Sequence, residues 1–272
     1  MSQEQIQTLL LTHHLTPNKL LGQNFMVDPT LYSNLCEYAT LTPSDIVLDV
    51  GAGFGFLTRF LSNKCHTVIA VEKDPQFIPV LCKNTQDLPN VSIVAGDVLK
   101  VQLPKFNKVI AIPPYYLSSQ LVIWTIEQNI NTAVMIVQKE FANRLLATVG
   151  SEEYSWLTVA VHQQANVTLH DEVPKDKFYP PPEVDSTILC LKSWTKKPFE
   201  VKNLPLFIQL TKLLFSERNK KLSKAITPFL RNNLKLDKHT AEKIAHTLPF
   251  AEHRPRELTP QDFGAILNAL PN

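Results

Sequence analysis

Three glycines and two carboxylates stand out in this sequence, because their spacing would suit a nucleoside. Gly51, Gly53 and Gly55 lie together in LDVGAGFGFLTRFL, although the whole chain of 272 residues has only seven glycines. Glycine allows a tight turn and lets a ligand approach the backbone with no Cβ in the way. Glu72, 19 residues beyond Gly53, can accept the hydrogens of both ribose hydroxyls, and Asp97 can accept a hydrogen from an adenine amine. The pattern predicts a site for a cofactor that contains adenosine.

The glycine spacing distinguishes two cofactors of this kind. The dinucleotide fingerprint is G-x-G-x-x-G, in which the pyrophosphate sits on the helix N-terminus. In this chain Phe56 stands where the third glycine belongs. The spacing therefore disfavours a pyrophosphate. It favours S-adenosylmethionine, which carries no phosphate and whose methionine end needs only a close approach to glycine.

Short apolar runs must position these residues. Between Asp45 and Gln138 the runs alternate with stretches of helical length: IVLDV (46–50), TVIAVE (67–72), VSIVAGD (91–97), KVIAI (108–112) and TAVMIVQ (132–138). Runs with so little polar alternation are typical of strands that helices cover on both faces. The expected fold class is α/β, with a parallel, doubly wound, Rossmann-like sheet. Runs at 167–173 and 186–192 could add antiparallel strands at its edge.

The last third of the chain differs in pattern and in charge. Apolar positions at 204–215 and 238–248 have helical spacing, so we expect a catalytic domain over 1–195 and a small helical domain over 196–272. The charge also differs along the chain. Residues 1–189 hold 12 Lys and Arg against 18 Asp and Glu, a net charge of −6 (12 − 18). Residues 190–272 hold 15 Lys and Arg against 7 Asp and Glu, a net charge of +8 (15 − 7). A basic tail favours a polyanionic partner. A solvated, lysine-rich surface would have the same composition.

Composition excludes several other classes. The chain is 44% hydrophobic and 19% charged, as soluble globular proteins are, and no apolar run reaches the roughly 18 to 20 residues that cross a bilayer. The segment MSQEQIQTLLLTHHL lacks the features of a secretory signal or a transit peptide, so we expect a cytoplasmic protein with no membrane partner. The four cysteines have no CxxC spacing and the eight histidines no H-x-x-x-H pattern, so no metal is expected.

Nine segments spread over most of the chain resemble one known family. They are NKLLGQNFMVD (18–28), LDVGAGFGFLT (48–58), VEKDP (71–75), GDVL (96–99), PYYLSS (114–119), GSEEYSWLTV (150–159), FYPPPEVDST (178–187), LLFSERNKKLSKAI (213–226) and HRPRELTPQDF (253–263). The sequence resembles the ribosomal RNA adenine N6,N6-dimethyltransferases, which include the kasugamycin-resistance methylase and are relatives of the erythromycin-resistance methylases. Several of these segments are specific to that family and not to methyltransferases at large.

The resemblance implies a set of residues that bind S-adenosylmethionine. Gln23, Asn24 and Met26 would line its methionine and ribose side, and Gly51 and Gly53 would form the floor. The rest of the implied set is Glu72 at the ribose, Lys73 beside it, and Asp97 with Val98 at the adenine.

The resemblance also implies a substrate, namely ribosomal RNA in the small subunit or its precursor. In this family the small helical domain helps to clamp the RNA, which agrees with the basic tail. The candidate phosphate ligands are Arg218, Lys220, Lys221 and Lys224. A monomer is expected when RNA is absent.

The run KVIAIPPYYLSSQ (108–120) departs from the family in its catalytic motif. Methyl transfer to an exocyclic amine needs acceptors that orient the amine and stabilise the positive charge that grows on nitrogen. The family's Asn-Leu/Ile-Pro-Tyr motif implies that the Asn side chain and a backbone carbonyl accept the amine hydrogens, while the aromatic ring stacks on the flipped-out base. Here the motif is Ile112-Pro113-Pro114-Tyr115, and an isoleucine side chain accepts nothing. Tyr115 still offers a stacking face, and Phe178 stands where relatives supply a second ring.

Ile112 leaves three hypotheses open. Backbone carbonyls such as those of Ile112 and Pro113 could compensate, so that the protein still dimethylates adenine. The target could instead be another exocyclic amine, such as cytosine N4. The protein could also bind RNA without methylating it, as a ribosome-assembly factor. Because Glu72, Asp97 and the glycine turn are intact, we favour an enzyme, with adenine N6,N6-dimethylation in small-subunit ribosomal RNA as the leading prediction.

Overall fold

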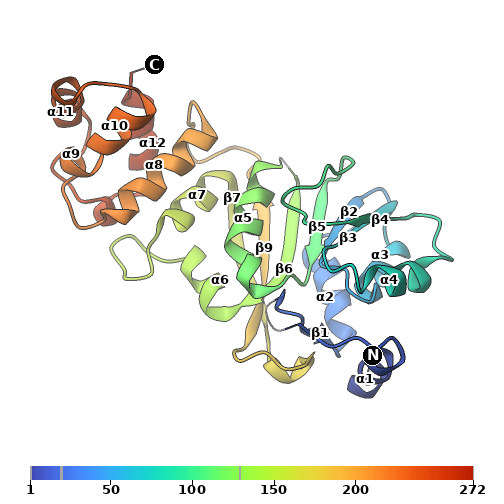
Figure 1. Cartoon of the computed structure of the whole chain (residues 1–272). Coiled ribbons are helices and arrows are strands. Elements are labelled where there is room, and N and C mark those ends of the chain that lie inside the picture. The colour runs from blue at the N-terminus through green and yellow to red at the C-terminus, as the bar shows by residue number, and fades with distance from the viewer. Residues whose placement is uncertain (1, 19–20, 129, 272) are drawn as a thin grey trace. The chain divides into compact units, whose positions relative to one another are not determined.

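The chain folds into two compact units. The computed structural model describes residues 2–18, 21–128 and 130–271 (Figure 1). One unit comprises Met1–Ala142 with Val167–Ser193, and we call it the sheet unit. The other comprises Asn143–Asn166 with Trp194–Asn272, and we call it the helical unit.

The sheet unit is built on a seven-stranded sheet with the strand order β4-β3-β2-β5-β6-β9-β7. The strands from β4 to β6 are parallel, and β9 runs antiparallel to β6. The strand order reverses between β2 and β5, and ligands of α/β sheets bind beyond the carboxyl ends of the strands at such a point. The bounds are β2 (Ile46–Val50), β3 (Thr67–Glu72), β4 (Val91–Ala95), β5 (Lys108–Ala111), β6 (Thr132–Gln138), β7 (Ala165–Val173) and β9 (Ser186–Ser193).

The predicted α/β class is confirmed. The five apolar runs are the five parallel strands, and the central residues of β2, β3, β5 and β6 are buried because helices cover both faces of the sheet. The residues of β4, at one edge of the sheet, are partly exposed. The run at 186–192 is antiparallel, as expected, but it lies inside the sheet, between β6 and β7. The strand at the other edge is β7, whose buried and exposed positions are mixed as in a strand that faces solvent.

Helices pack on the sheet through its alternating strand residues. On one face, Leu35 of α2 and Leu61 of α3 lie in one core cluster with Val47, Val68 and Ile110 of the sheet. The intervening strand residues point to the other face, and Figure 1 shows α5 in front of β6 and β9. The helices are α1 (Gln3–Thr12), α2 (Thr30–Tyr38), α3 (Phe56–Ser62), α4 (Ile78–Thr85), α5 (Ser118–Glu127) and α6 (Lys139–Leu145), with 3-10 turns η2 (Tyr115–Leu117) and η3 (Lys175–Lys177).

The N-terminal residues attach to the carboxyl end of the sheet. Ile6 and Leu10 of α1 are buried in a cluster with Phe54 and Phe77, which follow β2 and β3. Beyond α1, the short strands β1 (Phe25–Met26) and β8 (Phe178–Tyr179) form a separate antiparallel ribbon. The sequence patterns did not predict either element, because both are short and are stabilised by distant residues.

The helical unit has its own core. Its helices are α7 (Trp156–Gln164), α8 (Leu204–Ser216), α9 (Leu222–Ala225), α10 (Thr227–Asn233), α11 (Lys238–Thr247) and α12 (Pro260–Ala269), with the 3-10 turn η4 (Pro255–Glu257). Side-chain caps begin three of them: Asn203 accepts from the Leu206 N–H, Asp237 from Thr240, and Thr259 from Asp262. α8 and α11 are the two helices that the apolar spacing predicted.

The predicted single boundary at 195/196 needs a correction, because residues 143–166 belong to the helical unit. α7 packs against α8 and α12. Tyr154, just before α7, is buried in the core of the helical unit. Its ring packs edge-on against the Phe215 ring, with the ring centroids 5.4 Å apart. Its hydroxyl donates to the Leu258 carbonyl at 2.8 Å. These contacts join Tyr154 to residues 61 (215 − 154) and 104 positions away, and no local composition marks them.

Candidate active site

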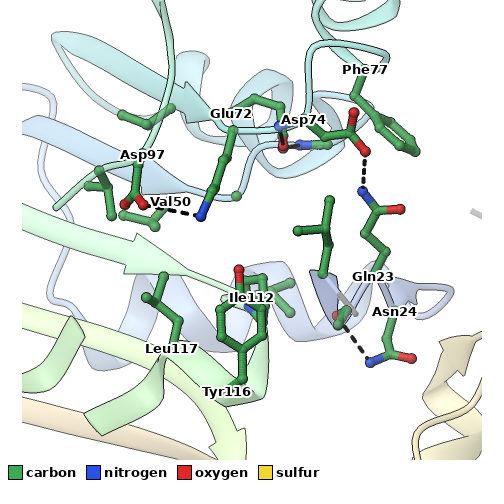
Figure 2. Close-up of a pocket in the computed structure, with 18 of the residues that line it drawn as sticks. Gln23, Asn24, Val50, Glu72, Asp74, Phe77, Asp97, Ile112, Tyr116 and Leu117 are labelled. Carbon is green, nitrogen blue, oxygen red and sulfur yellow. Dashed lines mark hydrogen bonds and ion pairs between the residues drawn. The ribbon is translucent and has the colours of Figure 1, made fainter. Parts of the chain in front are cut away.

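A pocket lies at the carboxyl ends of the central parallel strands, where the topology predicts a ligand (Figure 2). We call it the main pocket. The strand ends contribute Val50, Glu72, Asp97 and Val98, the loop after β5 contributes Ile112, Pro114 and Tyr116, and the N-terminal segment contributes residues 21–25. The structure thus brings together residues from three distant parts of the sequence.

The glycine turn forms one wall of this pocket. Gly51 and Gly53 have φ values of +79° and +55°, which L side chains rarely adopt. A Cβ on Gly51 would lie 3.6 Å from Cδ of Pro114 and 3.9 Å from the carbonyl oxygen of Ile112, so the turn faces the loop after β5. Gly55 has a different role: a Cβ there would lie 2.7 Å from Cδ1 of Leu81, because α3 begins where α4 approaches closely.

The Glu72 carboxylate is fixed by backbone donors. Its side chain is 7% exposed, its Oε2 accepts from the Gly53 N–H at 2.7 Å, and its Oε1 accepts from the Asp74 N–H at 2.7 Å. Burial raises the pKa of Glu72, and the hydrogen bonds from Asp74 and Gly53 oppose that rise. Each oxygen keeps a second lone pair, so the carboxylate can still accept from two ribose hydroxyls.

Asp97 and Val98 line the pocket after β4, as predicted, and Lys73 lies beside them. Asp97 Oδ1 accepts from the Leu99 N–H at 3.1 Å, and its Oδ2 is paired with Lys73 Nζ at 3.1 Å. Burial acts to raise the pKa of Asp97, but these two partners outweigh it and the pKa is lowered. Lys73 therefore already bonds one oxygen of the carboxylate that is predicted to accept from an adenine amine.

The N-terminal segment is tied to the pocket through Gln23 and Phe25. Gln23 Nε2 donates to Asp74 Oδ2 at 2.8 Å, next to Glu72 (Figure 2). The Phe25 ring packs against Phe54 and Phe77, with centroid distances of 4.7 and 5.4 Å. The sequence reasoning identified Gln23 but missed Asp74, Phe25 and Phe77. Asp74 could have been found, since it stands two residues after Glu72 in VEKDP.

Two predicted site residues belong to the core. Met26 is buried and does not line the main pocket, because it points to the sheet face that α2 covers. Phe178 is 3% exposed and pairs with Met26 across the β1–β8 ribbon. The expectation that Phe178 offers a ring face to a base is therefore not met in this structure.

The loop after β5 also differs in detail from the prediction. Ile112 and Pro114 line the main pocket, whereas Pro113 is buried behind them. The Tyr115 hydroxyl is hydrogen bonded to Ser186 Oγ at 2.5 Å, and Tyr115 is not a wall of the pocket. Its neighbour Tyr116 is 52% exposed and does line it. A stacking role for Tyr115 stays a prediction.

A smaller side pocket adjoins the main one. Met26, Tyr32 and Asp49 are among its lining residues. Asp49 is 1% exposed, and Thr58 Oγ1 donates to its Oδ2 at 2.6 Å. Burial raises the pKa of Asp49 to about 7, although the Thr58 hydrogen bond opposes this. The sequence reasoning missed Asp49, which directly precedes the glycine turn. Five residues line both pockets: Asn24, Phe25, Gly51, Gly53 and Ile112.

The predicted phosphate ligands lie in the helical unit, which holds 15 Lys and Arg against 9 Asp and Glu, a net charge of +6 (15 − 9). Arg218 donates to the carbonyls of Ser151 and Glu152, both at 3.0 Å, so it holds a loop. Lys220 pairs with Glu217 and Lys221 with Glu252, and Lys224 is exposed. The Leu222 N–H donates to the His253 carbonyl at 2.7 Å, which brings Arg254 and Arg256 near this cluster.

Other kinds of site are absent from the described part of the chain. Residues 2–18, 21–128 and 130–271 contain no group of three or more His, Cys, Asp or Glu that could hold a metal ion. No described helix has both the length and the apolar character that a membrane span requires.

A family model and two similar sequences all carry the names of ribosomal RNA methyltransferases. A family model described as ribosomal RNA adenine dimethylase matches residues 15–259. A probable ribosomal RNA small subunit methyltransferase A from Methanosarcina acetivorans is 34% identical over 250 residues, 91% of each chain. One from Methanopyrus kandleri is 33% identical over 272 residues, 99% of this chain and 98% of that one.

Two solved structures share nearly the whole fold. A dimethyladenosine transferase from Plasmodium falciparum superposes with a TM-score of 0.75 and 28% identity, over 90% of this chain and 96% of that one. The 23S rRNA methyltransferase ErmE superposes with a TM-score of 0.64 and 26% identity, over 91% of this chain and 99% of that one.

Proposed function

The chain belongs to the ribosomal RNA adenine dimethylase family, and we propose that it transfers two methyl groups from S-adenosylmethionine to N6 of one or more adenines in small-subunit ribosomal RNA. It is a methyltransferase enzyme with the α/β sheet of its relatives. The small subunit is favoured over the large one because relatives named for the small subunit reach 36% identity, whereas ErmE, named for 23S rRNA, reaches 26%.

One observation carries the proposal: two carboxylates on neighbouring strand ends share a pocket with the glycine turn and with the loop that bears Ile112. Glu72 ends β3, and Asp97 follows β4, its neighbour in the sheet. A buried, fixed carboxylate suits ribose hydroxyls, and a second one suits the adenine amine. The two acceptors on neighbouring strand ends thus correspond in kind to the ribose hydroxyls and the amine of adenosine.

The residues present fit S-adenosylmethionine. Glu72 would hold the ribose, Asp97 and Val98 the adenine, and the Cβ-free surface of Gly51 would leave room beside Ile112 and Pro114. Gln23 supports Glu72 indirectly, because it binds Asp74, whose N–H fixes the same carboxylate. When bound, the cofactor supplies an electrophilic methyl group on sulfur.

The loop after β5 would orient the target amine. The Ile112 carbonyl lies on the side of the loop that faces Gly51, so it can accept one amine hydrogen. The Ile112 side chain accepts none, and loss of one preorganised hydrogen-bonding group raises a barrier by roughly 2.7 to 4 kcal/mol, by analogy with oxyanion-hole donors. Such a loss slows an enzyme without abolishing its activity.

A direct test is methylation of purified ribosomal particles. The protein would be incubated with isotopically labelled S-adenosylmethionine and with small or large subunits, and the digested RNA analysed by mass spectrometry. We expect labelled N6,N6-dimethyladenosine from the small subunit. Labelled methylcytidine would move the target to cytosine N4, and the absence of label under conditions where the cofactor binds would favour a non-catalytic assembly factor.

A further inference from the structure

The loop after β5 would orient the target amine with backbone atoms. The Ile112 side chain accepts nothing, so this role falls to backbone carbonyls such as that of Ile112. A side-chain acceptor can turn about its own bonds, whereas a backbone carbonyl points where the conformation of the loop directs it. The residue that fixes this loop therefore bears on the proposed function, on which the present inference rests.

Two consecutive prolines limit how the backbone of this loop can be held. Pro113 and Pro114 have no N–H, so neither can donate a hydrogen bond to the sheet. The Pro114 carbonyl accepts from the Leu117 N–H at 3.0 Å, a bond within the turn that does not connect the loop to a strand. A side chain that does connect the loop to the sheet would therefore have a large influence on its conformation.

Tyr115 makes such a connection, through Ser186. The Tyr115 hydroxyl is hydrogen bonded to Ser186 Oγ at 2.5 Å. Ser186 is the first residue of β9 and is fully buried. Because β9 runs antiparallel to β6, this first residue lies at the same edge of the sheet as the carboxyl ends of β5 and β6. Since β6 lies between β5 and β9, the Tyr115 side chain joins the loop to the second strand along the sheet.

The position of Ser186 is itself fixed by its neighbours. Ser186 pairs with Gln138, the last residue of β6. The preceding residue, Asp185, is held by two hydrogen bonds. Its carbonyl accepts from the Lys139 N–H at 3.1 Å, and its Oδ1 accepts from the Lys175 N–H at 2.9 Å. Ser186 is therefore a rigid point to which the loop after β5 is tethered.

We propose that Ser186 is a positioning residue for methyl transfer, which fixes the loop after β5 through its hydrogen bond to Tyr115 and so keeps the Ile112 carbonyl on the side that faces Gly51. Neither Ser186 nor Tyr115 lines the main pocket or the side pocket. The hydrogen bond therefore acts on the loop and not on the cofactor. A misplacement of about 1 Å can slow a reaction about 100-fold, so a tether outside the pockets still affects the rate.

Loss of either hydroxyl should slow the reaction without weakening cofactor binding. In Ser186→Ala, and in Tyr115→Phe, which keeps the ring, we expect kcat for dimethyladenosine formation to fall about 10-fold or more. The Kd for S-adenosylmethionine, measured by calorimetry, should change less than about threefold. A purely structural hydrogen bond would lower the free energy of unfolding and leave kcat unchanged. Ser118→Ala is the matched control, since Ser118 Oγ is buried in the same part of the chain and has no hydrogen-bond partner among the described residues.

A double variant distinguishes one shared tether from two separate contributions. If the hydrogen bond carries both effects, Ser186→Ala combined with Tyr115→Phe should be no slower than the slower single variant, because neither hydroxyl is then left without its partner. Wild-type kcat in either single variant, a loss of cofactor affinity that equals the loss of kcat, or a double variant whose loss is the product of the two single losses would overturn the inference. A wild-type protein that forms no dimethyladenosine would instead overturn the proposed function, so the two failures are distinguishable.

Discussion

Glu72 and Gly53 are joined by a hydrogen bond of 2.7 Å from the glycine N–H to the Glu72 Oε2 atom. The other carboxylate oxygen accepts from the Asp74 N–H. The side chain proposed to bind the ribose therefore also fixes the glycine turn that forms a wall of the same pocket. One carboxylate would therefore serve both the proposed ligand recognition and the support of the backbone turn.

Glu72→Gln should weaken both roles. Its NH2 group must face either the Gly53 or the Asp74 N–H, and two donors cannot bond to each other. We expect S-adenosylmethionine affinity to fall about 10- to 100-fold, since hydrogen bonds to a charged group are worth about 1.5 to 3 kcal/mol. Calorimetry would measure this. Asp87→Asn, at an exposed carboxylate that follows α4 and pairs with Arg59, is the control. Equal affinity of Glu72→Gln and wild type would contradict the assignment.

Lys73→Ala should slightly raise the affinity for S-adenosylmethionine, whereas Glu72→Gln should lower it. Lys73 pairs with Asp97 Oδ2, and its side chain is half exposed, so the pair contributes less than about 1 kcal/mol. Its removal frees the oxygen for the adenine amine. We expect cofactor affinity to rise by up to about fivefold in Lys73→Ala and to fall in Asp97→Ala. If both variants lost affinity equally, Lys73 would itself contact the cofactor.

The Asp49 carboxyl predicts a pH dependence of stability. Its pKa is raised by burial from 3.8 to about 7, so between these pH values the folded protein binds a proton that the unfolded chain has lost. The contribution of Asp49 to the free energy of unfolding therefore falls as the pH rises from 3.8 to about 7, by at most about 1.4 kcal/mol per pH unit. Asn at this position has no such titration and can still accept from Thr58.

Urea unfolding of Asp49→Asn and wild type from pH 5 to pH 8 would measure this effect. We expect the free energy of unfolding of the variant, relative to wild type, to increase with pH. Asp176→Asn, at an exposed position, is the control. A difference that stays constant with pH would show that the Asp49 carboxyl does not change its ionisation on folding.

Gly55→Ala should destabilise the protein for two reasons that can be separated: backbone strain at a positive φ and steric overlap with Leu81. Gly55 has φ +83°, and a Cβ there would lie 2.7 Å from Cδ1 of Leu81, which is fully buried and cannot move away cheaply. Gly150 has φ +85° and nothing within 4 Å of its Cβ position, so Gly150→Ala measures the backbone term alone. We expect a loss of about 1 kcal/mol for Gly150→Ala and of about 2 to 4 kcal/mol for Gly55→Ala. Equal losses in urea unfolding would refute the packing argument.

The basic residues of the helical unit should have two different roles, RNA binding and support of a loop. Replacement of Lys220, Lys221 and Lys224 by Gln should weaken RNA binding and make log K less dependent on log salt, by up to about 0.7 to 0.9 per lost phosphate contact. Arg218→Gln should instead lower stability, because it removes the donors to the Ser151 and Glu152 carbonyls. Filter binding at several salt concentrations and thermal unfolding would test each group. An unchanged salt slope in the triple variant would move the RNA contacts elsewhere, for example to Arg254 and Arg256.

The sequence by itself determined the parallel sheet and the part of the main pocket that is formed by Glu72, Asp97 and the glycine turn. Apolar runs such as TAVMIVQ are typical of strands that helices cover on both faces. The five parallel strands could therefore be predicted from short stretches of sequence. Because parallel strands end at the same edge of a sheet, Glu72 and Asp97 had to come together once those strands formed. The glycine turn followed for a similar reason, since its backbone angles are open mainly to glycine.

Only the tertiary structure decided which neighbouring side chains face the pocket. Met26 and Phe178 are buried against each other by the β1–β8 ribbon, and Arg218 is used by a loop 66 residues away in sequence. Asn24 shares two pockets with Ile112 although 88 positions (112 − 24) separate them. Such pairings depend on non-local packing, in which many residues must settle together, so no short stretch of sequence encodes them.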